Sequence, residues 1–126
     1  MGARVRNPQS LLPLTAALLH VLLSLADSDK HGYAIIKEVR ERTNGVVSLG
    51  AGTLYSMLKR LLADGLVIES GERPDSGLDD ERRRYYRLTP FGRDVAIAEI
   101  HRLETLVLQA RQKHLVEAPS RSGHRH

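Results

Sequence analysis

The sequence predicts a mainly α-helical domain with one small β-hairpin and a long helix towards its C-terminal end. Three observations predict this fold class. Apolar residues recur three and four positions apart in several separate segments, β-favouring residues flank one turn-rich stretch, and the last periodic segment is the longest. A chain of 126 residues, of which 41% are hydrophobic, indicates a single domain with a real core.

The first helix is expected to start near Pro13, because proline suits a first helical position, and to end at about Ala26. Its buried stripe consists of Leu14, Leu18, Val21, Leu22 and Leu25. Pro13, His20 and Ser24 interrupt this stretch, which argues against a membrane span or a signal peptide. Since the chain also has no cysteine, we expect a cytoplasmic protein without membrane contact.

The second helix is expected to begin around His31 or Gly32. One side of it carries Tyr33, Ile36, Val39 and Thr43. Asn44 and Gly45 are expected to end it, because both residue types accept a left-handed backbone conformation.

The third helix, over Gly52 to Asp64, has the clearest pattern in the chain. Its apolar stripe consists of Leu54, Met57, Leu58, Leu61 and Leu62. Its outward side carries Gly52, Ser56, Lys59 and Ala63, with Tyr55 on one edge and Thr53 and Arg60 on the other. The outward side therefore mixes small, hydroxyl, aromatic and basic groups.

A hairpin with a long loop follows the third helix. Leu66 to Glu69 is expected to be its first strand, 74–81 its loop and Arg83 to Leu88 its returning strand, with β-favouring Tyr85 and Tyr86.

The last helix is expected to begin at Pro90, capped by Thr89, and to continue to about Leu115. A seam alternating four and three residues apart consists of Ala96, Ile100, Leu103, Val107 and Ala110. Such a seam is typical of a helix that pairs with another helix.

Three helices followed by a hairpin is the element order of a winged helix-turn-helix, a fold whose third helix enters the DNA major groove. We expect this domain at 11–88 and a C-terminal dimerisation helix at 89–117. The polar ends of the chain are expected to be a mobile basic arm at 1–10 and a disordered tail at 118–126.

The net charge of +4 supports nucleic-acid binding only weakly. Arg4 and Arg6 lie in the first ten residues, and Arg121 and Arg125 lie in the last nine. These four arginines account for the whole net charge, so the body between them has none. Binding of DNA by the body therefore depends on where its charges lie.

The outward side of the third helix meets the steric condition for groove entry. The major groove is about 12 Å wide and admits a helix whose outward residues are short and able to form hydrogen bonds. Gly52, Thr53, Ser56 and Lys59 fit that description. The alternative is an ordinary solvated helix face.

The densest basic cluster is Arg82, Arg83 and Arg84 together with Arg87. At the base of a wing such a cluster would neutralise two or three phosphates. The alternative, equally open, is that these arginines pair with the neighbouring acids Asp75, Asp79, Asp80 and Glu81.

Three segments, HGYAIIKEV, LGAGTLYSMLKRLLADGLV and ERRRYYRLTPFGR, resemble PadR-like transcriptional regulators in order and spacing, over about residues 11 to 111. The resemblance implies a homodimeric winged-helix repressor with its recognition helix at Gly52 to Asp64, its wing at about 67–88 and its last helix in the dimer. The implied partner is a double-stranded DNA operator, with half-sites about 34 Å apart or a multiple of that. The expected DNA-binding residues are Gly52, Thr53, Tyr55, Ser56, Lys59, Arg60, Arg82, Arg83 and Arg84. The expected dimer interface consists of Leu14, Leu18, Ala96, Ile100, Leu103, Val107 and Ala110.

Two departures from the family narrow this expectation. Only one helix follows the wing, which resembles the short members of the family, and the chain has no tryptophan. A pocket that stacks planar drugs between tryptophans is therefore not expected, and a small-molecule effector, if one exists, stays unidentified.

Other classes of site are poorly supported. Gly50, Ala51 and Gly52 lack the remaining residues of a phosphate-binding loop, and the six histidines show no metal-ligand spacing on a common helix face. We therefore expect no cofactor, no metal and no enzymatic activity. The alternative function is a winged-helix protein-interaction module without specific DNA binding, which the acidic wing loop favours.

Overall fold

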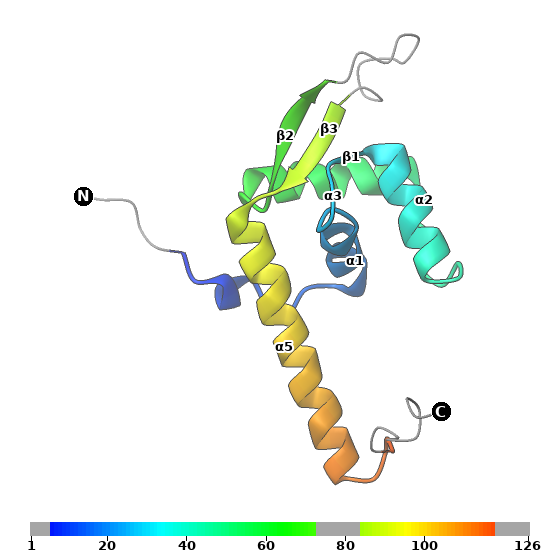
Figure 1. Cartoon of the computed structure of the whole chain (residues 1–126), viewed down its shortest axis with the longest axis vertical. Coiled ribbons are helices and arrows are strands. Elements are labelled where there is room, and N and C mark those ends of the chain that lie inside the picture. The colour runs from blue at the N-terminus through cyan, green and yellow to red at the C-terminus, as the bar shows by residue number, and fades with distance from the viewer. Residues whose placement is uncertain (1–5, 73–83, 118–126) are drawn as a thin grey trace, which may run out of the picture.

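The computed structural model describes residues 6–72 and 84–117, and it confirms the predicted fold class. Helices dominate, a small antiparallel sheet follows the third helix, and one long helix completes the described chain (Figure 1). The elements in chain order are η1 (Pro8–Leu11), α1 (Ala16–Ser24), β1 (Lys30–His31), α2 (Gly32–Arg42), α3 (Ala51–Ala63), β2 (Val67–Glu72), β3 (Arg84–Leu88) and α5 (Pro90–Gln112). None of the helices in these two ranges is long and apolar enough to cross a bilayer.

The core lies where α1, α2 and α3 meet the sheet and the first turns of α5. Its fully buried members include Val21, Leu22, Ile35, Leu54, Leu58, Leu66, Val67 and Val95. Full burial of one such side chain stabilises the fold by about 1.5 to 3 kcal/mol, so this cluster accounts for much of the driving force for folding.

Helix α1 begins at Ala16, three residues later than the sequence predicts. The Thr15 hydroxyl accepts a hydrogen bond from the Leu18 N–H (3.1 Å), which satisfies one of the free donors of the first turn. Pro13 lies before this cap. The start of α1 is therefore set by the Thr15 side-chain cap and not by Pro13.

The N-terminal segment differs from the predicted mobile arm over 1–10 in the part that the structure describes. Pro8–Leu11 forms the 3-10 helix η1, and the Asn7 side chain caps it by accepting the Gln9 N–H (3.0 Å). This turn packs against α5. Residues 6–10 therefore belong to the folded body.

Helix α2 buries Val39 as predicted, but the rest of its buried side differs from the predicted one. Gly32, Ile35 and Val39 are buried, whereas Tyr33 is 43% exposed and Ile36 only half-buried. Two stripes one residue apart both satisfy helical spacing here, and packing against α3 selects the stripe that starts with glycine. The predicted stop is confirmed, because Asn44 (φ 53°) and Gly45 (φ 81°) both adopt left-handed conformations.

The sheet has the strand order β1-β3-β2, with both pairs antiparallel. The sequence predicts the β2–β3 hairpin but not β1, whose two residues pair Lys30 with Tyr86 and His31 with Tyr85. A two-residue strand has no periodicity to detect. In β2 a bulge lies between Glu69 and Gly71, where Gly71 has a φ of 100°.

Helix α5 begins at Pro90 as predicted, because the Thr89 hydroxyl accepts the Gly92 N–H (2.9 Å). It ends at Gln112, before the predicted Leu115, and His114 then takes a left-handed conformation (φ 65°). Its first turns pack on the body, and its outer half extends away from the rest of the molecule (Figure 1).

Candidate nucleic-acid interface

Helix α3 is divided into a buried side and a solvent side. Leu54, Leu58 and Leu61 are no more than 3% exposed and fix the helix on the core. The solvent side carries the predicted small and polar residues, all of them exposed: Gly52, Thr53, Ser56, Lys59, Arg60 and Ala63. This placement confirms that the short polar side of the helix points outward.

The N-terminus of α3 is also open. Its N-cap residue is Gly50, which supplies no side-chain cap for the first turn. Backbone N–H groups of a first turn carry the positive end of the helix dipole and suit an anion. The start of α3 therefore places donors next to the exposed Gly52 and Thr53.

Tyr55 lies differently from its predicted position on the DNA-facing edge. Its ring is half-buried and packs on the start of α2, so closely that a Cβ atom on Gly32 would lie 2.4 Å from the Tyr55 hydroxyl oxygen. The next residue, Ser56, lies about 100° further around the helix and is exposed, so it takes no part in this packing. Tyr55 is thus a contact between α2 and α3.

The two basic residues of α3 have different surroundings. Lys59 is exposed and makes no ion pair within the described ranges. The Arg60 Nε atom lies 3.9 Å from an Asp64 carboxylate oxygen, and both side chains are exposed, so this pair is weak. Lys59 is the cation of α3 best placed to meet a phosphate.

The wing arginines fall into three cases. Arg84 opens β3 and is exposed, while Arg82 and Arg83 lie outside the described residues. Arg87 forms a two-pronged ion pair with Asp29, with Nε and Nη2 at 3.2 and 3.0 Å from its oxygens. The hydrogen bond to Asp29 raises the pKa of Arg87. Arg87 therefore fastens the wing to the segment before β1.

The acids proposed as alternative partners of the wing arginines, Asp75, Asp79, Asp80 and Glu81, also lie outside the described residues. Within them the acid that pairs with a wing arginine is Asp29, 58 residues away in sequence. Charge patterns in the neighbouring sequence do not reveal this ion pair, because the pairing of β1 with β3 brings Asp29 and Arg87 together.

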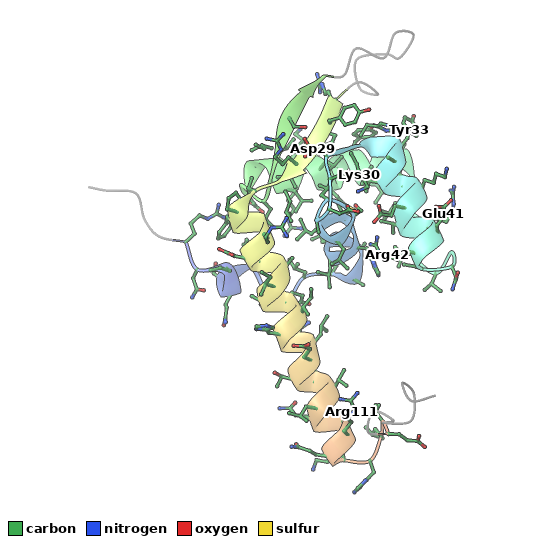
Figure 2. All side chains as sticks on the ribbon, viewed as in Figure 1. Asp29, Lys30, Tyr33, Glu41, Arg42 and Arg111 are labelled. Atoms are coloured by element: carbon green, nitrogen blue, oxygen red, sulfur yellow. The ribbon has the colours of Figure 1, made fainter. Side chains whose placement is uncertain are left out.

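An ion-pair cluster that the sequence reading missed joins α1 to α2. Lys30 Nζ lies 2.7 Å from an Asp27 oxygen and 3.4 Å from a Glu38 oxygen, and Arg42 pairs with the other Glu38 oxygen at 2.5 Å. Arg42 also donates to the His20 carbonyl (2.9 Å). Figure 2 labels Lys30, which belongs to β1, beside α2, and Arg42, at the end of α2, next to α1. The spacing of four residues between Glu38 and Arg42 is typical of an ion pair on one helix, and it could have predicted this part of the cluster from the sequence.

The same cluster shifts two acid-base equilibria. The hydrogen bond from Lys30 lowers the pKa of Asp27, while burial and then the charge of Arg42 lower the pKa of His20. His20 contacts Arg42 from α1 through its backbone carbonyl. The cluster therefore joins α1 to α2.

The predicted dimer interface needs one correction. Leu18 and Ala96 are each 7% exposed and belong to the core of the protomer, because the first turns of α5 pack on the body. The remaining predicted residues are Leu14, Ile100, Leu103, Val107 and Ala110, of which Leu103 and Val107 are exposed and the others half-buried. Two further apolar side chains of α5, Leu106 (48% exposed) and Leu108 (53% exposed), are exposed outside the predicted seam.

A buried acid marks the point where α5 leaves the body. Glu99 is 2% exposed and accepts two hydrogen bonds of 2.7 Å from Arg102. The hydrogen bond from Arg102 lowers the pKa of Glu99 despite its burial, and a backbone hydrogen bond from Leu14 adds to this effect. The pair therefore ties α5 to the segment that leads into α1.

No group of three His, Asp or Glu side chains in the described ranges is close enough to hold a metal ion. The hollows along α5 are shallow and partly apolar. One of about 490 Å³ lies between η1 and α5, where Leu12, Arg102 and Leu106 line it, and one of about 410 Å³ lies beside Leu103 and Val107.

Comparison with known proteins agrees with this architecture. The family model described as Transcriptional regulator PadR-like family matches residues 19–98. The transcriptional regulator Rv3488 of Mycobacterium tuberculosis is 38% identical over 91 residues, which cover 72% of this chain and 78% of the relative.

Solved structures give the same result. A PadR family transcription regulator from Clostridium difficile has a TM-score of 0.60 and 31% identity, with 79% of this chain and 97% of that chain covered. Bacillus subtilis PadR in complex with operator DNA has a TM-score of 0.60 and 20% identity, over 70% of this chain and 48% of that chain. The second similarity concerns the fold alone. These relatives are transcription regulators, not enzymes.

Proposed function

The chain belongs to the PadR-like family of transcriptional regulators, and from that premise we propose that it binds a two-fold symmetric DNA operator as a homodimer and represses transcription there. The observation that carries this proposal is the division of α3 into a buried leucine side and an exposed side of short polar residues. A helix that enters the major groove needs such a side, because long side chains would hold the backbone away from the base edges.

Four exposed residues of α3 have distinct roles in this proposal. Thr53 and Ser56 carry short hydroxyl groups for base edges, and Gly52 lets the backbone approach closely. Lys59 meets a phosphate. Arg84, with Arg82 and Arg83 beside it in sequence, contacts the flanking backbone from the wing.

The outer half of α5 supports the homodimer. All residues from 103 to 109 are exposed, and among them are four large apolar side chains: Leu103, Leu106, Val107 and Leu108. Leu103 and Val107 lie next to each other beside Ile100, and exposed apolar side chains gathered on a protruding helix mark a protein interface. Pairing two copies of α5 through Ile100, Leu103, Val107 and Ala110 covers Leu103 and Val107 and relates the two winged-helix bodies by two-fold symmetry.

The proposal assigns residues 11–88 to operator binding and 89–117 to dimerisation. A regulator of this kind works in the compartment that holds the DNA, which is the cytoplasm in bacteria. Structural kinship supports this use of the fold, since one relative of the same fold was solved with operator DNA.

Titration of the purified protein with fragments of the region upstream of its own gene tests the DNA-binding part. Saturable binding that survives competition from unrelated DNA is expected, and affinity that falls with salt by a slope of about −0.9 for each phosphate contact. Lys59→Ala should reduce that slope by about 0.9, whereas Lys113→Ala, an exposed lysine beyond α5, should leave it unchanged. Equal affinity for every fragment would reject a sequence-specific regulator.

Light scattering on the same preparation tests the homodimer. The expected mass is about twice the 14.1 kDa of one chain. A monomer at micromolar concentration would reject the dimer while leaving DNA binding open to the titration.

A further inference from the structure

The end of α3 and the start of α5 are joined by backbone contacts. The Thr89 N–H donates to the Leu66 carbonyl (3.0 Å), and the Thr89 hydroxyl donates to the Gly65 carbonyl (2.7 Å) while it accepts the Gly92 N–H. One threonine therefore caps α5 and holds the two residues that leave α3.

Gly92 brings the two segments still closer. A Cβ atom at this position would lie 2.1 Å from the Leu66 carbonyl oxygen and 2.9 Å from Leu88 Cδ1. Only a residue without a side chain allows α5 to rest directly on the backbone that follows α3. The first turn of α5 thus has a fixed position relative to the end of α3.

Arg6 adds a side-chain contact to the same junction, on its solvent side. Its Nη1 atom donates to the Asp64 carbonyl (2.5 Å), which belongs to the C-cap of α3, and its guanidinium lies 4.2 Å above the centre of the Phe91 ring in α5. A cation above an aromatic face and a charged donor on a carbonyl are both attractive contacts. Arg6 therefore bridges α3 and α5 although it belongs to neither.

We propose that this α3–α5 junction, formed by Arg6, Thr89, Phe91 and Gly92 around the carbonyls of residues 64–66, sets the spacing of the operator half-sites. Arg6 acts in it as a positioning residue. The proposal rests on the dimeric operator-binding function proposed above, in which the outer half of α5 holds the two subunits together. The angle at the junction then fixes how far apart the two α3 helices lie.

Because α5 is long, a small change of its angle at the junction moves its far end by several ångströms. The 23 residues of α5 span about 34 Å at about 1.5 Å per residue. A tilt of about 5° at its base displaces the far end by about 3 Å, which is close to the rise of about 3.4 Å per base pair along one strand. A displacement of that size shifts the two α3 helices relative to each other by about one base-pair step along the DNA axis, which weakens their fit to a given half-site spacing.

Arg6 is the member of the junction that can be changed without disturbing the core, because its side chain is exposed. A matched control is Arg42→Ala, which also removes a guanidinium bond to a distant carbonyl, that of His20 (2.9 Å). This control contact joins α1 to α2 and does not involve α5.

A series of operators whose half-sites are separated by one base pair more or fewer gives the test. Wild type is expected to prefer one spacing, and Arg6→Ala to lose about threefold or more of that preference, as expected for removing one charged hydrogen bond. Arg6→Lys, which keeps a donor and a cation, should recover part of it, and Arg42→Ala should keep the wild-type profile.

The salt dependence at the best spacing separates positioning from direct contact. If Arg6 only positions the helices, the salt slope of Arg6→Ala equals that of wild type, whereas loss of a phosphate contact reduces it by about 0.9. An unchanged spacing profile in Arg6→Ala, or a reduced salt slope, would overturn the role of the junction while the regulator itself stands. Absence of any sequence preference in wild type would instead reject the proposed function.

A measurement without DNA gives a second check. The chain has no cysteine, so Ala63→Cys, on the exposed side of α3, carries a single nitroxide label in each subunit. Pulsed electron paramagnetic resonance of the labelled dimer should give one narrow distribution of the distance between the two labels. Arg6→Ala should broaden this distribution, and Arg42→Ala should leave it narrow. Equal widths in all three proteins would contradict the proposal.

Discussion

Helix α3 is exposed along one side and the outer half of α5 is exposed all round, and the two expose different chemistry. The solvent side of α3 carries glycine, hydroxyl and lysine side chains, whereas the outer half of α5 carries leucine and valine. A polar side gains little from leaving water, and an apolar side gains about 25 cal/mol for each Å² that it buries. The first is therefore suited to a polar partner such as DNA, and the second to another protein surface.

The buried side of α3 should give the largest effect on stability. Leu58→Ala removes a side chain that is 1% exposed and leaves a cavity, so the free energy of unfolding should fall by about 3 kcal/mol. The same change at Leu108, which is 53% exposed, should cost far less in a chain kept monomeric. Urea denaturation of both variants measures this difference, and equal losses would contradict the structure at α3.

A charge on the outer half of α5 should give the next largest effect. Leu103→Glu places a carboxylate where the proposed dimer pairs the two α5 helices, and the dissociation constant of that dimer should rise by about thirtyfold or more. Far-ultraviolet circular dichroism should stay unchanged, because the residue is exposed in the protomer. Sedimentation equilibrium checks the expectation against Gln112→Glu at the end of the same helix, and an unaltered dimer in Leu103→Glu would remove α5 from the interface.

The acid buried between these two regions should make stability depend on pH. Because Arg102 lowers the pKa of Glu99 in the folded state, its contribution is complete above the ordinary value of 4.5. It is lost as the pH falls from there through the lower folded pKa. Glu99→Gln should cost about 1 to 2 kcal/mol at pH 7 and less at pH 4. Urea denaturation at both pH values measures this, with the exposed Glu104→Gln as the control and a pH-independent loss as the contrary result.

The solvent side of α3 should give the smallest effect on stability. Ser56→Ala should change the free energy of unfolding by less than about 0.5 kcal/mol, since the side chain is exposed. It should nevertheless alter which base the protein prefers, by about 1 kcal/mol or more at one operator position. A binding selection with random operators measures this, and identical preferences in variant and wild type would show that Ser56 does not face the bases.

Sequence alone predicted α3 well because its leucines define one stripe without a competitor. The stripe of α2 was misplaced at its start by one position, since the patterns that begin at Gly32 and at Tyr33 are both regular, and the close packing of Tyr55 on Gly32 distinguishes them. Periodicity identifies a helix. It does not say which of two adjacent stripes meets the core.

Contacts between distant residues were the part that sequence reasoning could not supply. The pairing of β1 with β3 and the bond from Arg87 to Asp29 depend on residues more than 50 positions apart. Similarly, Ala96 fits the seam of α5 by spacing but is buried by its own protomer, which only the docking of α5 on the body reveals. The roles of Arg82 and Arg83 stay predictions.

The bulge in β2 bears on how the protein avoids uncontrolled assembly. Because β3 lies between β1 and β2, the described sheet leaves the outer edge of β2 without a neighbouring strand, a place where copies of a protein can add to one another. The irregularity between Glu69 and Gly71 breaks the even row of backbone donors and acceptors along that edge, and the exposed Glu69 adds a charge there. Growth into fibres through this edge is thereby discouraged, so the edge does not compete with the self-association that we propose for α5.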